Sequence, residues 1–163
     1  LTSSLGRMFD AVSVMLGLKK TVSFEGQAAA MLEAATRRGE GKVLPYAVQK
    51  ENGAWVLDLS PCVRTIAESA ASSKDMPYLA ASFHATLIES FAHTAGLIRD
   101  DTDLDRVVLS GGCFQNIILL QGCVKRLERD GFTVFFHRMV PANDGGVSLG
   151  QAVAAAYRIK KGI

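Results

Sequence analysis

The sequence predicts an α/β fold, and three features of its second half support that prediction. Residues 106–109 form a short apolar, β-branched run, which is typical of a buried parallel strand. Ser110-Gly111-Gly112 interrupts the run, and apolar residues at helical spacing follow from Ile117 to Leu127. A second strand-like run at 132–136 and a final helix at 147–157 complete the order strand, helix, strand, loop, helix. This alternation indicates parallel strands joined by a helix.

The first half of the chain is expected to begin with two helices. Ser3 or Ser4 can cap a helix that stops at Gly17, since a serine cap and a terminal glycine are common helix boundaries. Ser23 opens a second helix, which we expect to end at Arg37-Arg38-Gly39.

A hairpin and a third helix follow. Strand-like runs at 43–48 and 54–59 are separated by a polar stretch that ends in Asn52-Gly53, a pair that strongly favours a tight hairpin turn. Pro61, a residue suited to the first position of a helix, then starts a helix to about Ala71.

A long helix begins at Pro77 and carries His84 and His93, nine residues apart. Zinc ligands on one helix are three or four residues apart, so these histidines do not form one site and are expected to be structural. The four aspartates within 100–105 lack the glycine and terminal glutamate of a calcium loop, and a solvated turn is expected there.

Composition excludes several classes of function. The chain has 163 residues, 48% of them hydrophobic and 21% charged, with a net charge of +2, so we expect a globular protein with no nucleic-acid partner. No apolar run reaches the ~18 residues of a membrane span, and no secretory signal is visible. The three cysteines form no Cys-x-x-Cys pair, which favours reduced thiols and a cytoplasmic location.

The turn after the first parallel strand is the first candidate site. Gly111 and Gly112 would let a ligand lie against bare backbone, and the N-terminus of the following helix favours anions. Asn116 is expected one turn into that helix, where its amide suits a ribose or a base edge. Cys113 at a helix N-terminus could instead be a nucleophile with His137 as its base, although a small buried cysteine is the commoner use of this residue.

A second candidate site precedes the last helix. Asn143-Asp144-Gly145-Gly146 places two oxygen-bearing side chains beside two glycines. Asp144 there suits either a helix cap or a metal ligand. Near the other end of the chain, Asp10 has Arg7 three residues before it, and on its residues alone this pair indicates a surface ion pair.

Four motifs follow one another along the chain: residues 3–12 (SSLGRMFDAV), 23–29 (SFEGQAA), 109–116 (LSGGCFQN) and 141–146 (PANDGG). Together and in this order they resemble the HypF family, the carbamoyltransferases that mature [NiFe] hydrogenases. The resemblance implies a partial domain over residues 1–163: the second lobe of an actin-like, sugar-kinase and heat-shock ATPase (ASKHA) fold. That domain is related to the tRNA threonylcarbamoyl-transferase family.

The resemblance also implies roles for individual residues. Asp10 would contact a ribose hydroxyl, Asn116 the nucleotide, and Asp144 an active-site iron or zinc ion. The remaining implied positions form a backbone platform beside the nucleotide and a loop that lines the same cleft: Gly111 and Gly112, and Glu25, Gly26 and Gln27.

The implied activity belongs to a longer protein. Members of the HypF family use ATP and carbamoyl phosphate to make carbamoyl adenylate, and then pass the carbamoyl group to the C-terminal cysteine of a partner, HypE. The metal's His-x-x-x-His ligands and the N-terminal domains are absent from this chain. We therefore expect the chain to be a fragment that is inactive alone and able to self-associate through an uncovered lobe face.

Three other functions remain open at this stage. The first is a tRNA threonylcarbamoyl transferase from the same superfamily. The second is a thiol amidotransferase that uses Cys113, and the third is a non-catalytic nucleotide-binding module.

Overall fold

The computed structural model describes residues 4–36, 40–72 and 75–162. The predicted helix end at 37–39 and the alternative cap Ser3 therefore lie outside the described residues. The helices are α1 (Leu5–Met15), α2 (Gln27–Ala35), α3 (Ser60–Ser72), α4 (Met76–Thr102), α5 (Ile117–Arg129) and α6 (Val147–Lys161). The strands are β1 (Ala47–Glu51), β2 (Ala54–Asp58), β3 (Arg106–Leu109) and β4 (Thr133–Phe136), and the short 3₁₀ turns are η1 (Gly112–Gln115) and η2 (Asp144–Gly146).

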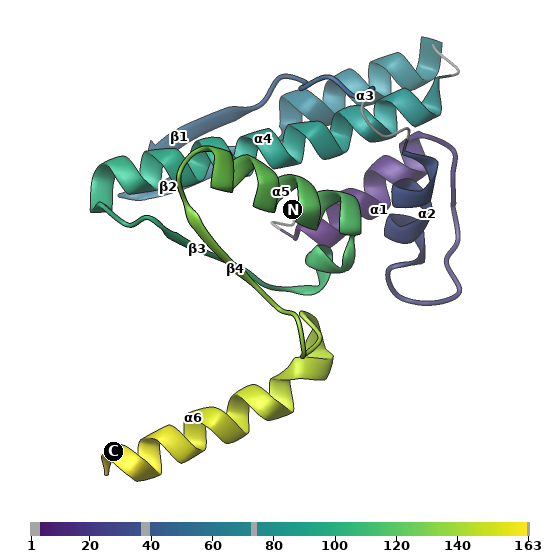
Figure 1. The fold of residues 1–163 in the computed structure, drawn as a ribbon. Helices are drawn as coiled ribbons and strands as arrows, with labels where there is room; N and C mark the ends of the chain where they lie inside the picture. Colours follow the sequence, from purple (N-terminus) through teal and green to yellow (C-terminus); the bar gives the residue numbers. More distant parts are fainter. Residues whose placement is uncertain (1–3, 37–39, 73–74, 163) are drawn as a thin grey trace.

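The predicted strand–helix–strand unit is confirmed. β3 and β4 pair in parallel with Arg106 opposite Thr133 and Leu109 opposite Phe136, and α5 connects them across one face (Figure 1). The apolar side of α5 is buried at Leu119, Cys123 and Leu127, between the strands and α4.

The hairpin is confirmed, but its first strand lies further along the chain than predicted. Asn52 and Gly53 both have positive φ angles, 49° and 83°, as a two-residue type I′ turn requires. Residues 43–46 are not a strand, because the backbone of Lys42 and Leu44 bonds to side chains of α4. The N–H of Leu44 donates to Thr86 Oγ1 at 2.8 Å, and the N–H of Lys42 donates to Ser82 Oγ at 3.2 Å.

The second helix starts later than Ser23. Gly26 is left-handed, with φ of 80°, and α2 begins only after it. The side chain of Gln27 then accepts a hydrogen bond from the N–H of Ser23 at 2.8 Å, so residues 23–26 form a turn in front of the helix.

The long helix α4 continues into the predicted acidic turn at 100–105. Asp101 lies within α4, which ends at Thr102. Its carboxylate accepts from Lys50 Nζ at 2.6 Å and from Trp55 Nε1 at 2.9 Å. This part of the acidic run therefore holds the β1–β2 hairpin against α4 and is not merely solvated.

One hydrophobic core lies among α1, α2, α3, α4 and α5. Its largest fully buried apolar side chains are Phe9, Val12, Leu32, Ile66, Phe83, Leu87, Leu119 and Leu127. None of the described helices has both the length and the apolar character that a membrane crossing requires.

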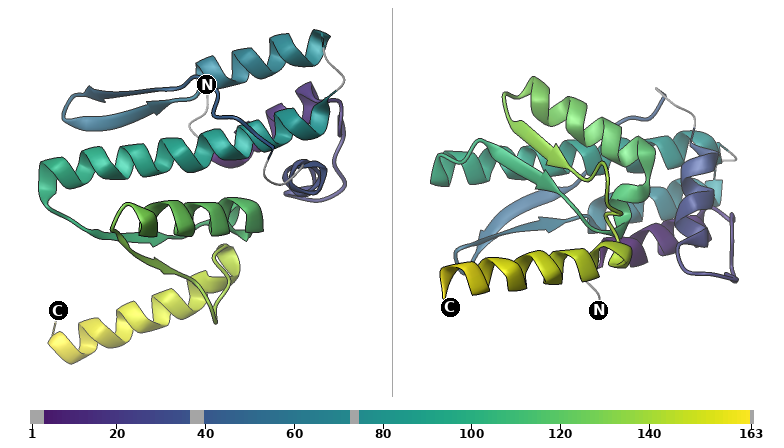
Figure 2. Two further views of the ribbon diagram at one scale, coloured as in Figure 1. Left: turned by 45° about the horizontal axis from the view of Figure 1, so that its top comes forward. Right: turned by 60° about the horizontal axis from the view of Figure 1, so that its bottom comes forward.

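In contrast, α6 stands away from this body in Figure 1 and in the left view of Figure 2, and it has no buried residue. Val153 and Tyr157 on α6 are 61% and 58% exposed, and Val108 and Phe135 on the sheet are 70% and 50% exposed. The structure thus leaves apolar faces of α6 and of the β3–β4 sheet uncovered.

Candidate functional site

The two glycine-containing candidate sites lie side by side. The N–H of Gly111 donates to the carbonyl of Ala142 at 3.0 Å, and a Cβ added to Gly112 would lie 3.8 Å from Cβ of Asn143. Gly111 has φ of 101°, a conformation that L side chains rarely adopt. The turn after β3 and the loop before α6 therefore form one surface at the carboxyl ends of the strands.

Helix α1 brings Asp10 to the same place. A Cβ added to Gly6 would lie 4.0 Å from Cys113 Sγ, so α1 packs directly against η1. Asp10 forms an ion pair with Arg7 at 3.5 Å, as its spacing indicated, and its side chain is 38% exposed. Both readings of Asp10 are compatible with this geometry, since an exposed carboxylate beside the glycine turn remains accessible to a ligand.

The N-terminus of α5 does not provide the open anion site that the sequence indicated. Glu33 on α2 accepts from the N–H of Ile117 at 2.7 Å and of Ile118 at 3.4 Å. Asn116 Oδ1 accepts from the N–H of Leu119 at 2.9 Å, and the N–H of Leu120 bonds to the Asn116 carbonyl. All four first-turn amides are satisfied within the protein, so an anion would have to displace Glu33 to bind them.

Asn116 is the N-cap of α5 and not a residue one turn inside it. Its side chain is buried, with the residue 8% exposed. Besides capping Leu119, its Nδ2 lies 2.8 Å from Nε2 of His84 on α4. An asparagine amide carries two N–H groups, and the described hydrogen bonds use one of them. Any ligand contact by this side chain is thus restricted to the second N–H and the remaining lone pair of Oδ1.

The geometry disfavours Cys113 as a nucleophile. Burial raises the pKa of its thiol, and the negative charge of nearby Asp10 raises that pKa further. His137 is not its base either, because His137 Nε2 lies 2.9 Å from Ser110 Oγ. A nucleophilic cysteine needs a lowered pKa or an adjacent base, and the contacts around Cys113 supply neither.

Asp144 is exposed in η2, and the cap there is Asn143, whose Oδ1 accepts from the N–H of Gly145 at 3.1 Å. Across the described ranges, no group of three or more His, Cys, Asp or Glu side chains is arranged to hold a metal ion. The described residues therefore supply one carboxylate and not a complete metal site.

The predicted cleft-lining segment of residues 25–27 makes no described hydrogen bond to the glycine turn or to the 141–146 loop. Glu25 and Gly26 are exposed in front of α2, and Gln27 is half-buried. The hydrogen bond from Ser23 to Gln27 is local to this segment. Their predicted place beside the nucleotide stays a prediction.

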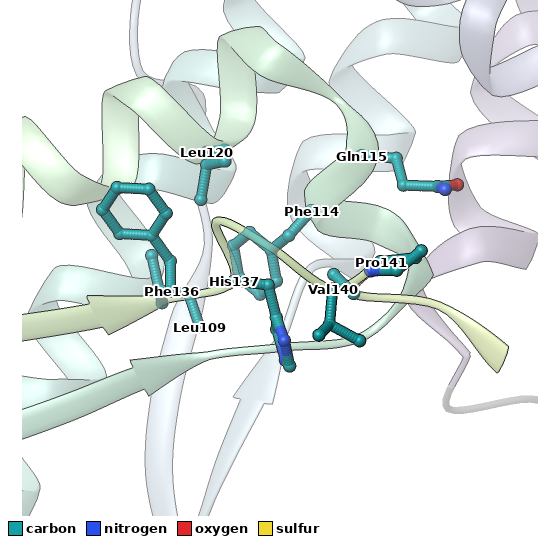
Figure 3. Close-up of a pocket in the computed structure, with 9 residues that line it drawn as sticks. Leu109, Phe114, Gln115, Leu120, Phe136, His137, Val140 and Pro141 are labelled. Carbon is teal, nitrogen blue, oxygen red and sulfur yellow. The ribbon is translucent and has the colours of Figure 1, made fainter. Parts of the chain in front are cut away.

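A small cavity of about 170 Å³ lies next to the glycine turn, between the strand ends and α5 (Figure 3). Phe114, Leu120 and Phe136 line it together with Val140 and Pro141. Of the candidate residues named from the sequence, His137 lines this cavity, whereas Asp10, Asn116 and Asp144 do not. Gln115 and His137 also line it, so the cavity has both apolar and polar walls.

The sequence analysis did not identify Glu33, and it named His84 only as a structural histidine, which its burial confirms; their contacts at the start of α5 were not predicted. Glu33 lies 84 positions from Ile117, and His84 lies 32 positions from Asn116. A glutamate inside an amphipathic helix and a histidine on a long helix carry no local pattern that points to such distant partners. Only the packing of α2 and α4 against the start of α5 brings them there.

Comparison with known proteins assigns the family. Residues 1–151 match the family model described as "Carbamoyltransferase, Kae1-like Domain, second subdomain". The chain is 33% identical to Carbamoyltransferase HypF of Synechocystis sp. over 94% of its own length and 19% of the relative's. It is 35% identical to Carbamoyltransferase HypF of Rhizobium leguminosarum bv. viciae, over 94% of the chain and 20% of the relative.

Two solved structures show the same arrangement. A full-length HypF crystallised in a phosphate- and nucleotide-bound form matches with a TM-score of 0.89 and 43% identity, over 94% of this chain and 20% of that one. The HypF of T. kodakarensis matches with a TM-score of 0.78 and 27% identity, over 98% and 20%. The chain thus spans about a fifth of the length of these relatives, and the ASKHA-like, partial-domain fold is confirmed. The protein belongs to the HypF carbamoyltransferase family and corresponds to part of its Kae1-like domain.

Proposed function

We propose that this chain is the nucleotide-binding lobe of a HypF-type carbamoyltransferase and that it binds carbamoyl adenylate. The observation that carries the proposal is the single surface formed by the Gly111–Gly112 turn and the 141–146 loop, joined by the bond from Gly111 to Ala142. Asp10 on α1 flanks this surface, and its charge acts on neighbouring Cys113. An exposed carboxylate beside bare backbone suits a ribose hydroxyl next to a phosphate.

The structural relative supports a nucleotide ligand. A full-length HypF with 43% identity to this chain was crystallised with phosphate and nucleotide. Because Glu33 already occupies the amides of Ile117 and Ile118, the proposed adenylate contacts are placed on the glycine turn and not on the N-terminus of α5.

The proposed reaction transfers the carbamoyl group to an external thiol. The sulfur of the C-terminal cysteine of a HypE-type partner bonds to the carbamoyl carbon, the bond from that carbon to the adenylate phosphate oxygen breaks, and AMP leaves. The thiol proton passes to solvent. The raised pKa of Cys113 accords with an acceptor thiol that comes from another protein.

The described residues supply only part of a metal site. We propose Asp144 as one ligand of an iron or zinc ion, with the histidine ligands supplied by another part of a longer protein. A single exposed carboxylate does not hold such an ion tightly.

The uncovered apolar faces suggest what the rest of a longer protein does. We propose that α6 and the outer face of the β3–β4 sheet pack against the remainder of the Kae1-like domain, because residues such as Val108 and Val153 are 70% and 61% exposed. The isolated chain is then expected to self-associate, which light scattering can test, and to lack transfer activity.

The experiment that tests the function uses a full-length carbamoyltransferase that contains this chain. Asp144→Ala and Asp10→Ala should each abolish or strongly reduce carbamoyl transfer to the partner cysteine, with unchanged circular dichroism. Asp105→Ala is the matched control, because the exposed Asp105 carboxylate makes a 3.9 Å ion pair with Arg106, and the backbone bond from Thr133 to the Asp105 carbonyl does not depend on that side chain. Full transfer by the Asp144 and Asp10 variants would contradict the proposed site.

The family assignment favours this function over a tRNA threonylcarbamoyl transferase, since the matching model and the relatives described above are HypF carbamoyltransferases. A non-catalytic module would bind nucleotide in calorimetry and show no transfer in the full-length protein.

A further inference from the structure

A buried histidine joins the glycine turn to the rest of the core. His84 on α4 is 1% exposed, and its two ring nitrogens have different partners. Nδ1 lies 2.8 Å from the carbonyl oxygen of Ala80 and 3.3 Å from Thr36 Oγ1, whereas Nε2 lies 2.8 Å from Asn116 Nδ2. The ring also packs against Phe9 of α1, with the centroids 5.5 Å apart.

These contacts determine where the protons lie. The Ala80 carbonyl can only accept, so His84 Nδ1 carries the hydrogen. Asn116 Oδ1 accepts from the N–H of Leu119, so the Asn116 nitrogen faces His84 and donates to Nε2. Rotating the Asn116 amide by half a turn would exchange its oxygen and nitrogen, and both the bond from Leu119 and the bond to His84 would be lost.

Burial keeps His84 suited to this role. It lowers the pKa of the imidazole, against the opposite effects of the Ala80 carbonyl and the Glu33 carboxylate. A neutral ring can accept from Asn116, whereas a protonated ring would bring N–H against N–H.

We propose that His84 is a positioning residue of the nucleotide site: by accepting a hydrogen bond from Asn116, it fixes the Gly111–Asn116 turn for its ligand. The inference rests on the proposed function, because it assumes that this turn meets the nucleotide. Asn116 is the last residue of the turn, and its side chain is held at one end by α5 and at the other by His84. His84 therefore fixes both the backbone position where the turn meets α5 and the direction of the second Asn116 N–H.

A purely space-filling role would not need an imidazole. The neighbouring buried positions on the same helix, Phe83 and Leu87, are apolar and 0% exposed. A buried polar ring is unfavourable unless its partners are all present, and the partners here lead from α4 to the turn. The specific feature to test is the acceptor at the Nε2 position.

The test uses calorimetry with AMP on a full-length carbamoyltransferase that contains this chain. The signal followed is the AMP binding that Asn116→Ala removes, which separates this site from any other nucleotide site in the protein. His84→Leu removes the acceptor and keeps the volume apolar. His84→Asn keeps a donor near the Ala80 carbonyl but is too short to reach Asn116, and so provides a polar variant if the leucine protein folds poorly. His84→Gln places an amide oxygen near the Nε2 position and is the expected rescue.

Thr86→Val is the matched control. Thr86 is also fully buried on α4, and its hydroxyl holds Leu44 of a different loop, so its loss should reduce stability without moving the turn.

We expect the dissociation constant for AMP to rise about tenfold in His84→Leu and His84→Asn, because the turn would then spend only a small fraction of its time in the competent arrangement. His84→Gln should stay within about threefold of the unchanged protein, and Thr86→Val should bind AMP normally despite a lower melting temperature.

The two proposals fail in different ways. If Asn116→Ala leaves AMP binding unchanged, the turn is not the nucleotide site and the proposed function itself is wrong there. If Asn116→Ala weakens binding while His84→Leu and His84→Asn do not, the positioning role is overturned. It is equally overturned if Thr86→Val weakens binding as much as they do, or if His84→Gln is no better than His84→Asn.

Discussion

Removing the carboxylate of Glu33 should weaken the start of α5 and convert it into an anion site. Glu33 reaches from α2 to accept from the N–H of Ile117 at 2.7 Å and of Ile118 at 3.4 Å. It thereby joins two helices and places a negative charge at the positive end of α5. Glu33→Ala removes both effects, whereas Glu33→Gln keeps an acceptor and removes the charge.

The expected loss follows from these two contributions. A hydrogen bond to a charged group contributes about 1.5–3 kcal/mol when buried. The value here should be lower because Ile117 is 45% exposed and water can replace the carboxylate. A charge at a helix terminus contributes about 0.3–1 kcal/mol. We therefore expect Glu33→Ala to lower the free energy of unfolding by about 1–2 kcal/mol and Glu33→Gln by about 0.5 kcal/mol.

Urea denaturation measures the loss, and amide hydrogen exchange at Ile117 and Ile118 locates it. Glu68→Ala is the control, since Glu68 is an exposed glutamate within α3, and its removal should change stability by less than about 0.5 kcal/mol. Sulfate should stabilise Glu33→Ala more than the unchanged protein, because the freed amides can bind an anion. Equal stability of the Glu33 and Glu68 variants, with no added effect of sulfate, would refute the reasoning.

Three further predictions concern other parts of the structure. Gly41→Ala should lower the free energy of unfolding, measured by urea denaturation, by about 3 kcal/mol, because the new Cβ would lie 2.3 Å from the backbone carbon of Ala81. Gly96→Ala is the control and should not lower it, because nothing lies within 4 Å of the Cβ added there. Hydrogen bonds from Lys50 and from the indole of the single tryptophan lower the pKa of Asp101 below its ordinary value of 3.8. The Asp101 carboxylate therefore holds the hairpin fully at pH values above 3.8, and this contact is lost as the pH falls through the lowered pKa of the folded protein. Tryptophan fluorescence should report that release, and Asp101→Asn should remove its pH dependence. Cys113→Ala should retain carbamoyl transfer in the full-length protein, and a rate loss of about a hundredfold or more would restore the nucleophile hypothesis.

The parts of the fold that could be predicted from the sequence depend on neighbours along the chain. The Asn52-Gly53 turn was identified because both residues tolerate positive φ, and the structure shows both in that conformation. The strand–turn–helix–strand order from 106 to 136 was readable because periodicity changes sharply at Gly111 and Gly112.

The errors occurred where a distant segment supplied the partner. Residues 43–46 have strand-like composition, yet Thr86 takes the hydrogen bond that a neighbouring strand would have taken. Asp101 was expected in a solvated turn, and the hairpin at Lys50 gives it a specific contact. Composition describes what a segment can do, and the competing partner lies outside any local window.

The candidate site likewise has features that local sequence predicts and features that depend on distant segments. Local sequence was enough to identify the glycine turn, the acidic loop residue Asp144 and, through four ordered motifs, the family. Helix packing, which no local pattern reveals, brings Glu33 to the amides of Ile117 and Ile118 and buries Asn116 against His84. The physical reason is that helix termini and buried amides must be satisfied by some partner, and the chain chooses that partner through helix packing, which brings together residues 32 to 84 positions apart.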